Sequence, residues 1–388
     1  MSGAIVSLGC RLNIAESEAI RGFLADGPPT VVVNSCAVTA EAVRQSRRAV
    51  RRLRRENPEA RLVVTGCAAT IEQDAFSGMA EVDAVIPNAD KLKPQVWGSR
   101  GATQRQSVKH TRAFVPVQNG CDHSCTFCII PQGRGRSLSL PVANVLAAIA
   151  RHEGVGEVVL TGVDVTSWGT DLPGEPRLGD LVAAILAAFP ALLRLRLSSL
   201  DGIEIDPLLF ELITTEPRIM PHVHISLQSG NDMILKRMKR RHSRNQAISL
   251  VQSMKALRPE IAIGADIIAG FPTETPEMHA DNVSIVRECR VVYGHVFPYS
   301  PRPGTPAARM PQVDPAIVRE RAAQVRAAVA DERARWLDSL LDKPAQVLAE
   351  RDGTGHAGHF ASYRVPAGTP TGSLVTVTPT KIVEGILE

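Results

Sequence analysis

The sequence predicts an α/β protein built from three units, and three observations support this prediction. Near the N-terminus, three β-like runs each precede a helix-like stretch, which indicates a parallel sheet. Six further strand-then-helix patterns indicate a partial (β/α)6 barrel, because a complete barrel has eight such units. Short runs rich in Val, Thr, Gly and Pro at the C-terminus indicate a small β-barrel.

The N-terminal unit covers residues 1–90 and carries a helix pattern at 38–55. Its β-like runs lie at 4–8, 31–33 and 62–65. Each run is closely followed by a cysteine: Cys10, Cys36 and Cys67. Because the carboxyl ends of parallel strands lie at one edge of the sheet, we expect these cysteines to converge. Residues 91–112 are polar with little periodicity, and we expect them to form a linker.

The middle unit covers residues 113–341. Its candidate strands lie at 114–118, 157–161, 193–197, 222–228, 261–269 and 291–297. Amphipathic helix patterns between them include those at 142–152, 178–188 and 245–257. A helix pattern at 315–341 ends the unit, and the β-rich C-terminal unit covers residues 342–388.

Two of the candidate strands carry polar side chains on one face. In the strand at 222–228 every second residue is polar, and in the strand at 193–197 Arg194 and Arg196 share a face. A closed barrel normally fills its interior with apolar side chains, so a polar inner face predicts a cavity for a polar ligand. The alternative is that these are edge strands with a solvated face.

Composition narrows the class of protein. The sequence is 44% hydrophobic and 22% charged, which excludes wholesale disorder. We expect a cytoplasmic protein, since no apolar run approaches a membrane span and the N-terminus lacks a signal-peptide pattern. The formal charge of +4 slightly favours an anionic partner. In a reducing compartment, seven cysteines favour metal binding or catalysis over disulfides.

Three of these cysteines form a compact cluster in sequence: Cys121, Cys125 and Cys128. Three thiolates within eight residues can hold an iron–sulfur cluster and leave one iron of a four-iron cluster open. Cys289 lies in a helix pattern and is expected to pack in the core rather than supply a fourth ligand. A zinc site completed by His123 stays open as an alternative.

The spacing Cys-x-x-x-Cys-x-Phe-Cys after a strand resembles the radical S-adenosylmethionine (SAM) superfamily, and in particular its methylthiotransferases. The supporting motifs are Leu8-Gly9-Cys10-Arg11-Leu12-Asn13, Val33-Asn34-Ser35-Cys36, Thr65-Gly66-Cys67, Cys128-Ile129-Ile130-Pro131, Ser226-Leu227-Gln228-Ser229-Gly230 and Gly270-Phe271-Pro272-Thr273-Glu274. The resemblance spans nearly the whole chain, and the C-terminal unit is similar to the RNA-binding TRAM domain.

This resemblance implies two [4Fe-4S] clusters. The catalytic cluster is implied at Cys121, Cys125 and Cys128, with SAM on its open iron and an external one-electron donor. The auxiliary cluster associated with sulfur delivery is implied at Cys10, Cys36 and Cys67, and a second SAM supplies the methyl group.

The resemblance also implies contacts to SAM. Phe127 matches the position that flanks the SAM adenine, although an ordinary core aromatic is the alternative. The other candidates for SAM contacts lie near predicted strand ends: Arg196, Ser199, Gln228 and Asp266.

The motif around Cys10 most resembles the branch that methylthiolates C2 of N6-threonylcarbamoyladenosine at position 37 of tRNA. The isopentenyladenosine branch usually reads Tyr-Gly-Cys-Gln-Met-Asn, and the ribosomal-protein branch has Pro-Lys after the cysteine. This chain instead has Arg11-Leu12. Both branches stay open as alternatives, as does a metal-containing RNA-binding protein without radical chemistry.

Two basic stretches are consistent with a tRNA partner. One is the helix pattern that carries Arg44, Arg47, Arg48, Arg51, Arg52, Arg54 and Arg55, and the other spans residues 236–241. Such clusters suit phosphate backbones, although solvated helix faces explain either one equally well. Aromatic residues make up only 4%, so a recognised base is expected to be splayed out into the active site rather than stacked on a surface.

Overall fold

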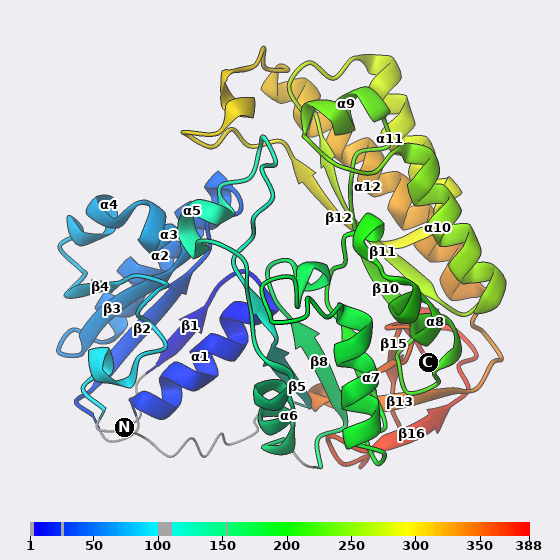
Figure 1. Cartoon of the computed structure of the whole chain (residues 1–388), viewed down its shortest axis with the longest axis horizontal. Helices are drawn as coiled ribbons and strands as arrows, with labels where there is room; N and C mark the ends of the chain where they lie inside the picture. The colour runs from blue at the N-terminus through cyan, green and yellow to red at the C-terminus, as the bar shows by residue number, and fades with distance from the viewer. Residues whose placement is uncertain (1–3, 25–26, 100–110, 153) are drawn as a thin grey trace.

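The N-terminal sheet lies beside a half-barrel of six strands, and the C-terminal sheet covers the lower end of that half-barrel (Figure 1). This arrangement comes from a computed structural model that describes residues 4–24, 27–99, 111–152 and 154–388. The predicted α/β class is confirmed. Within the described ranges, no helix is both long enough and apolar enough to cross a membrane.

The N-terminal sheet is parallel and has the strand order β1-β2-β3-β4. Its strands are β1 (Ile5–Ser7), β2 (Thr30–Ser35), β3 (Arg61–Gly66) and β4 (Ala84–Ile86). Its helices are α1 (Arg11–Phe23), α2 (Ala40–Glu56), α3 (Cys67–Ile71) and α4 (Gln73–Ser77). Strand β4 has only three residues, too few for an alternating pattern, and the sequence did not predict it.

Two glycines allow the chain to turn sharply at the carboxyl edge of this sheet. Gly9 and Gly66 both have φ +94°, a conformation that disfavours any residue with a Cβ. A Cβ on Gly66 would lie 2.4 Å from the carbonyl oxygen of Ser35, and one on Gly9 would lie 2.8 Å from Sγ of Cys36. The close approach of β1, β2 and β3 at this edge therefore depends on glycine.

The middle unit is the predicted partial barrel. Its strands are β5 (Arg112–Pro116), β8 (Glu157–Thr161), β9 (Leu195–Leu197), β10 (His222–Gln228), β11 (Ala262–Ala269) and β12 (Val291–Pro298). They form two parallel three-stranded sheets, which β-bridges from Leu195 to Ile219 and from Leu200 to Ile225 join. Of the described residues, none supplies a further strand that would close this barrel.

Helices cover the outer face of the half-barrel (Figure 1). The longer ones are α6 (Val142–Ala150), α7 (Leu178–Ala188), α8 (Pro207–Thr215), α10 (Arg244–Leu257), α11 (Pro276–Glu288) and α12 (Pro315–Asp338). Short elements at its upper end are β6 (Gln118–Asn119), α5 (Ile130–Arg134), β7 (Leu138–Ser139) and α9 (Asp232–Arg237).

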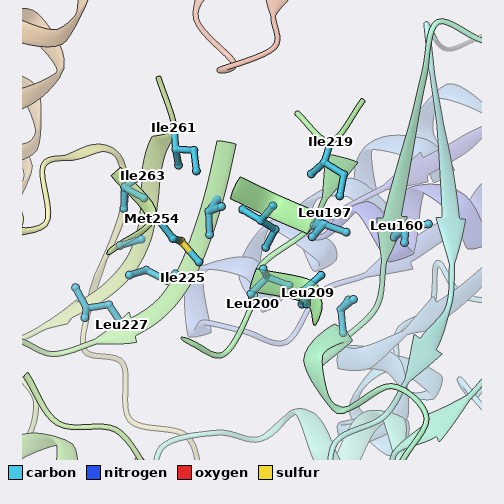
Figure 2. Packing of buried hydrophobic residues seen from close by; sticks show 14 of the residues in the cluster. Leu160, Leu197, Leu200, Leu209, Ile219, Ile225, Leu227, Met254, Ile261 and Ile263 are labelled. Atoms are coloured by element: carbon cyan, nitrogen blue, oxygen red, sulfur yellow. The ribbon is translucent and has the colours of Figure 1, made fainter. Parts of the chain in front are cut away.

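The two faces of β10 differ as predicted. Ile225 and Leu227 pack in the apolar core against the helices, together with Met254 of α10 (Figure 2). His222 and His224 point to the opposite face, yet both are buried, so this face is not solvated as the edge-strand alternative required. Cys289 lies in the apolar core, as expected.

The C-terminal unit is an open six-stranded sheet of order β16-β13-β14-β15-β18-β17. Its strands are β13 (Ala345–Ala349), β14 (Thr354–Ala357), β15 (Ser362–Arg364), β16 (Leu374–Val377), β17 (Ile382–Val383) and β18 (Ile386–Leu387). Because no pairing joins β16 to β17 in the described ranges, the expected small barrel does not close.

A buried ion-pair network ties the C-terminal sheet to the half-barrel. Glu157 at the start of β8 accepts hydrogen bonds from Arg196 at 2.7 and 2.9 Å and from Arg112 at 2.7 Å. Arg112 also pairs with Glu350, and Arg194 donates to the carbonyl oxygen of Gln346 at 2.6 Å. The carboxylate of Glu157 thus holds together the strand ends on which the C-terminal sheet rests.

Replacing Glu157 with Gln should lower the free energy of unfolding by about 3–5 kcal/mol, because it leaves buried guanidinium groups without their counter-charge. Burial alone would raise the pKa of Glu157, but the adjacent guanidinium groups lower it to about 2. Its stabilisation is therefore complete above the ordinary pKa of 4.5 and is lost as the pH falls toward 2. Chemical unfolding at several pH values measures both effects. Glu41→Gln, which removes an exposed partner of Arg44, is the control and should show no measurable change.

Replacing Gly66 with Ala should destabilise the N-terminal unit by more than about 1–3 kcal/mol, the cost of its backbone conformation alone (φ +94°, ψ −174°), because its Cβ would also clash with Ser35. Gly98→Ala is the matched control. Gly98 has φ +75°, but a Cβ there would meet nothing within 4 Å, so only the backbone cost applies. Equal losses of stability in the two variants, measured by chemical unfolding, would contradict this account.

Candidate active site

Cys121, Cys125 and Cys128 lie in the loop that connects β6 to α5 at the upper end of the half-barrel. Backbone hydrogen bonds shape this loop: the amide of Cys121 donates to the carbonyl of Gly135 at 3.2 Å, and that of Cys128 donates to the carbonyl of Cys125 at 3.2 Å. Burial raises the pKa of Cys121 to about 12 and that of Cys128 to about 11, and the neighbouring thiols of this group add to both shifts. We call these residues the loop trio.

Cys10, Cys36 and Cys67 lie at the carboxyl ends of β1, β2 and β3 and come together there, as the strand-end pattern predicted. Burial raises the pKa of Cys36 to about 11, and electrostatic repulsion from Cys67 and Cys10 contributes to this shift. We call these residues the sheet trio. Its cysteines follow three strands that are held in register by the parallel sheet.

Helix α5 brings the two trios close to each other. It begins two residues after Cys128, and its residue Gly133 packs so tightly on α3 that a Cβ there would lie 3.4 Å from Cα and Cβ of Cys67. The charge of Cys67 also affects the pKa of Cys128. The loop trio and the sheet trio are therefore neighbours although they belong to different units.

Arg134, the last residue of α5, reaches into the sheet trio and is buried. Its Nε donates to Sγ of Cys67 at 3.2 Å, and its Nη1 and Nη2 donate to the carboxylate of Glu16 at 2.9 and 3.0 Å. Lys91, also buried, donates to the same carboxylate at 2.5 Å. One carboxylate thus compensates two buried cations beside the sheet trio.

The sequence motifs do not assign roles to Arg134, Glu16 or Lys91. A signal for Glu16 was present, since it lies on helix α1 four residues from both Leu12 and Ile20, which are buried. A carboxylate on the apolar face of a helix indicates a buried cationic partner. The sequence could not indicate which cation this was, because Arg134 is 118 positions away.

Charged groups also surround the loop trio. Arg240 donates through Nη1 to Sγ of Cys125 at 3.7 Å, and its Nη2 forms an ion pair with the carboxylate of Asp201 at 2.9 Å. His123 contacts the carboxylate of Asp164 at 2.7 Å. Hydrogen bonds to Asp164 and Glu204 raise the pKa of His123 to about 10, so this imidazole is cationic at neutral pH.

These contacts bear on the zinc alternative. A tetrahedral zinc ion holds its sulfur ligands about 3.8 Å apart, given Zn–S bonds of about 2.3 Å. In the described ranges, three groups of possible ligands lie within 4.8 Å of one another, and neither cysteine trio is among them. His123 belongs to such a group with Cys121 and Asp164, but not with Cys125 and Cys128. The donor set therefore fits a larger cluster better than a single ion.

The donor set also fits iron–sulfur clusters by charge. The thiols of Cys36, Cys121 and Cys128 are neutral at physiological pH on their own, because their pKa values are raised to about 11 or 12. A cationic cluster is what converts such buried thiols into thiolate ligands. Arg134 and Arg240 supply hydrogen bonds to sulfur on either side, of the kind that tunes such clusters.

Three of the residues predicted to contact SAM lie near the upper end of the half-barrel. Phe127 belongs to the loop trio segment and packs edge to face on Phe271, with ring centroids 6.4 Å apart. Gln228 ends β10 with φ +63°, at an irregularity in the register with β11. Ser199 is half-buried just after β9.

The other two residues predicted to contact SAM have protein partners. Arg196 is fully buried and forms the two hydrogen bonds to Glu157 described above. Asp266 accepts hydrogen bonds at 3.1 Å from both His224 and His295, which hold its pKa well below the ordinary value despite its burial. Long-range partners of this kind cannot be read from the pattern of a single strand.

The basic stretch on α2 is solvent-exposed over most of its length, but its arginines have carboxylate neighbours. Arg44 and Arg48 pair with Glu41, and Arg51 pairs with Glu81. Exposed ion pairs of this type contribute little to stability, so a phosphate can replace the carboxylate. In the second stretch, Arg240 faces the loop trio rather than solvent.

Comparison with known proteins agrees with this architecture. Residues 115–284 match the family model described as the Radical SAM superfamily, and residues 3–87 match the one described as Uncharacterized protein family UPF0004. The radical SAM methyltransferase TsrM from Kitasatospora setae, solved with tryptophan and a SAM analogue, has a similar fold. Its TM-score is 0.53 at 17% identity, over 77% of this chain and 67% of that chain.

Two relatives are similar over almost their whole length. The threonylcarbamoyladenosine tRNA methylthiotransferase MtaB of Rickettsia prowazekii is 44% identical over 99% of this chain and 96% of its own. The protein of the same name from Thermotoga maritima is 32% identical over 89% of this chain and 86% of its own. The chain therefore belongs to the threonylcarbamoyladenosine tRNA methylthiotransferase family of radical SAM proteins.

Proposed function

We propose that this protein is an enzyme that adds a methylthio group to C2 of N6-threonylcarbamoyladenosine at position 37 of tRNA. The observation that carries the proposal is the close approach of two cysteine trios, one in a radical SAM half-barrel and one on a separate sheet. An enzyme that inserts sulfur at an unreactive carbon needs both a radical source and a sulfur source next to the same substrate atom. The similarity to relatives with this activity in their names supports the choice of substrate.

The cofactors of this family are SAM and [4Fe-4S] clusters. We assign one cluster to the loop trio and the other to the sheet trio. When bound, these groups supply the one-electron cleavage of SAM, the sulfur and the methyl group. Because each trio has only three thiolates, each leaves one iron of a four-iron cluster open to a ligand that is not a cysteine.

The protein side chains position and neutralise these centres. Arg134 holds Cys67 by a hydrogen bond and is itself held by Glu16, so the sheet trio keeps its place relative to α5. Arg240 holds Cys125 by a hydrogen bond and is itself held by its ion pair with Asp201. Both guanidinium groups offset part of the negative charge that thiolate ligands bring into a buried site.

The SAM contacts also belong to this proposal. Phe127 is assigned to the SAM adenine, and Ser199 and Gln228 are assigned to SAM because they lie at or near the ends of β9 and β10. Asp266 is kept as a SAM contact although it lies in the middle of β11 and not near its end, where the sequence pattern predicted it. Arg196 is the weakest of the predicted contacts, since its guanidinium group lies against Glu157.

The proposed function also includes a division of the chain into domains and a location in the cell. We propose a methylthiotransferase domain at 1–90, a linker at 91–112, a radical SAM domain at 113–341 and a TRAM-like RNA-binding domain at 342–388. Of the linker, residues 100–110 lie outside the described ranges. We further propose that the protein acts in the cytoplasm on an anticodon-loop adenosine and takes electrons from an external one-electron donor.

Replacing Cys121, Cys125 and Cys128 together with Ala should abolish SAM cleavage and lower bound iron from about eight to about four atoms per chain. The matched triple variant of the sheet trio should lose a similar amount of iron but still cleave SAM. Iron analysis and SAM-cleavage assays after anaerobic reconstitution measure both properties. Cys289→Ala is the control and should keep all the iron. SAM cleavage by the loop-trio variant would refute the assignment.

Deleting the gene should remove the methylthio form of threonylcarbamoyladenosine from cellular tRNA and leave the precursor nucleoside in its place. Mass spectrometry of tRNA nucleosides measures both species. Expression of the wild-type gene should restore the product, whereas the sheet-trio triple variant should not. An unchanged amount of the methylthiolated nucleoside in the deletion strain would rule out the proposed function. Loss of a different methylthiolated nucleoside would show that the substrate is a different one.

A further inference from the structure

Three arginines surround the ring of Phe360, which lies in the turn between β14 and β15 of the C-terminal sheet. The guanidinium carbons of Arg196, Arg112 and Arg11 lie 4.8, 5.6 and 5.9 Å from its ring centroid. Arg112 and Arg196 come from the half-barrel, whereas Arg11 comes from α1 of the N-terminal unit. We call these three residues and Phe360 the arginine cluster, which joins all three units.

The arginine cluster holds more positive than negative charge. Arg112 and Arg196 share the carboxylate of Glu157, and Arg112 also pairs with Glu350. Arg194 adds a fourth guanidinium group, 3.9 Å from Glu157. No carboxylate of the described residues forms an ion pair with Arg11, so four cations face two anions. Arg11 has a pKa below its ordinary value because of burial and of repulsion from Arg196 and Arg112.

Two N–H groups of the arginine cluster are buried without an acceptor. Nη1 of Arg196 and Nη2 of Arg112 have no hydrogen-bond partner among the described residues. The side chain of Arg196 is only 1% exposed, so leaving its N–H unpaired carries a large desolvation cost. A buried cationic group with a spare donor indicates that an acceptor binds there.

Other groups near the arginine cluster do not supply this acceptor. His222 faces Phe360 at a ring distance of 5.1 Å, and burial together with Arg196 keeps its pKa well below the ordinary value. Asp266, a carboxylate on β11, accepts from His224 and His295. The missing acceptor is therefore not a side chain of these strands.

We propose that Arg11, with the spare N–H groups of Arg112 and Arg196, binds the carboxylate of the threonyl group on the substrate nucleoside. This inference rests on the proposed function and names the residue that selects the substrate. A guanidinium group matches a carboxylate with two parallel hydrogen bonds. Arg11 directly follows Cys10, so a carboxylate held here belongs to a nucleoside that lies beside the sheet trio.

A backbone phosphate fits the arginine cluster less well. Arg196 is fully buried and Arg112 nearly so, with exposed side-chain fractions of 1% and 13%. Phosphates of a folded RNA contact exposed side chains such as those on α2, whereas nitrogens this deeply buried favour a small anionic group on a flexible arm. The threonyl carboxylate is such a group, and unmodified adenosine has none.

The test compares Arg11→Gln with wild type on two tRNAs of identical sequence, one with threonylcarbamoyladenosine and one with unmodified adenosine at position 37. Reconstituted protein is titrated with each tRNA at fixed salt, and the dissociation constants are measured by fluorescence anisotropy. Arg11→Gln should weaken binding of the modified tRNA by about tenfold and leave binding of the unmodified tRNA unchanged. Arg11→Lys keeps the charge but not the two parallel hydrogen bonds, so it should restore only part of the loss.

Arg48→Gln is the matched control, because Arg48 is an exposed arginine on α2 with a side-chain exposure of 71%. It should change both dissociation constants by the same factor. Circular dichroism and iron content show that each variant is folded and loaded.

Three results would overturn the inference. They are an equal effect of Arg11→Gln on both tRNAs, no effect on either, and a wild-type protein that binds both tRNAs equally while it methylthiolates the modified one. Failure of the proposed function is a separate result, in which wild-type protein yields no methylthiolated threonylcarbamoyladenosine.

Discussion

The guanidinium group of Arg134 is the contact on which the placement of the two cysteine trios depends. It comes from the half-barrel, directly after the loop trio, and it ends in a buried position between Cys67 and Glu16 of the N-terminal unit. A buried cation without its carboxylate is strongly destabilising, so the two units have one low-energy way to dock. Gly133 adds a steric condition, since a Cβ there would lie 3.1 Å from Cδ1 of Ile71 and 3.4 Å from Cys67, so a neighbour would have to shift by a few tenths of an ångström. The distance between the two centres is therefore set by charge and by the absence of a side chain.

The same principle recurs at the lower end of the half-barrel. Glu157 forms ion pairs with arginines of neighbouring strands. The C-terminal sheet contributes Glu350, which pairs with Arg112, and the ring of Phe360, which lies against Arg196. A buried ion pair contributes less to stability than an apolar contact of the same size. The free-energy cost of separating its two partners is larger, because each is left as an unpaired buried charge. The occurrence of such pairs at both boundaries indicates that they fix the relative orientation of the units, whereas the apolar cores stabilise each unit from within.

Sequence patterns predicted most of the scaffold because the scaffold is locally encoded. The strand at 222–228 and the helix at 178–188 have the predicted ends, and the cysteines of β1, β2 and β3 converge because parallel strands finish at one edge. The partners of buried charges were not predictable. Arg196 was expected to contact SAM because it lies near a predicted strand end, but Glu157, 39 positions away, occupies two of its three nitrogens. Phe360 gave no signal, since a lone aromatic in a turn has no periodicity.

The turn that carries Phe360 has a consequence for the modular view of this protein family. A small terminal domain is usually regarded as an exchangeable module that is joined to the rest of the protein by a flexible linker. Here the turn of the C-terminal sheet contacts both other units, because the hydroxyl of Tyr293 donates to the carbonyl of Phe360 and the ring of Phe360 meets Arg11 and Arg196. Exchanging the C-terminal sheet between homologues would therefore also change the packing of the arginine cluster, which all three units share.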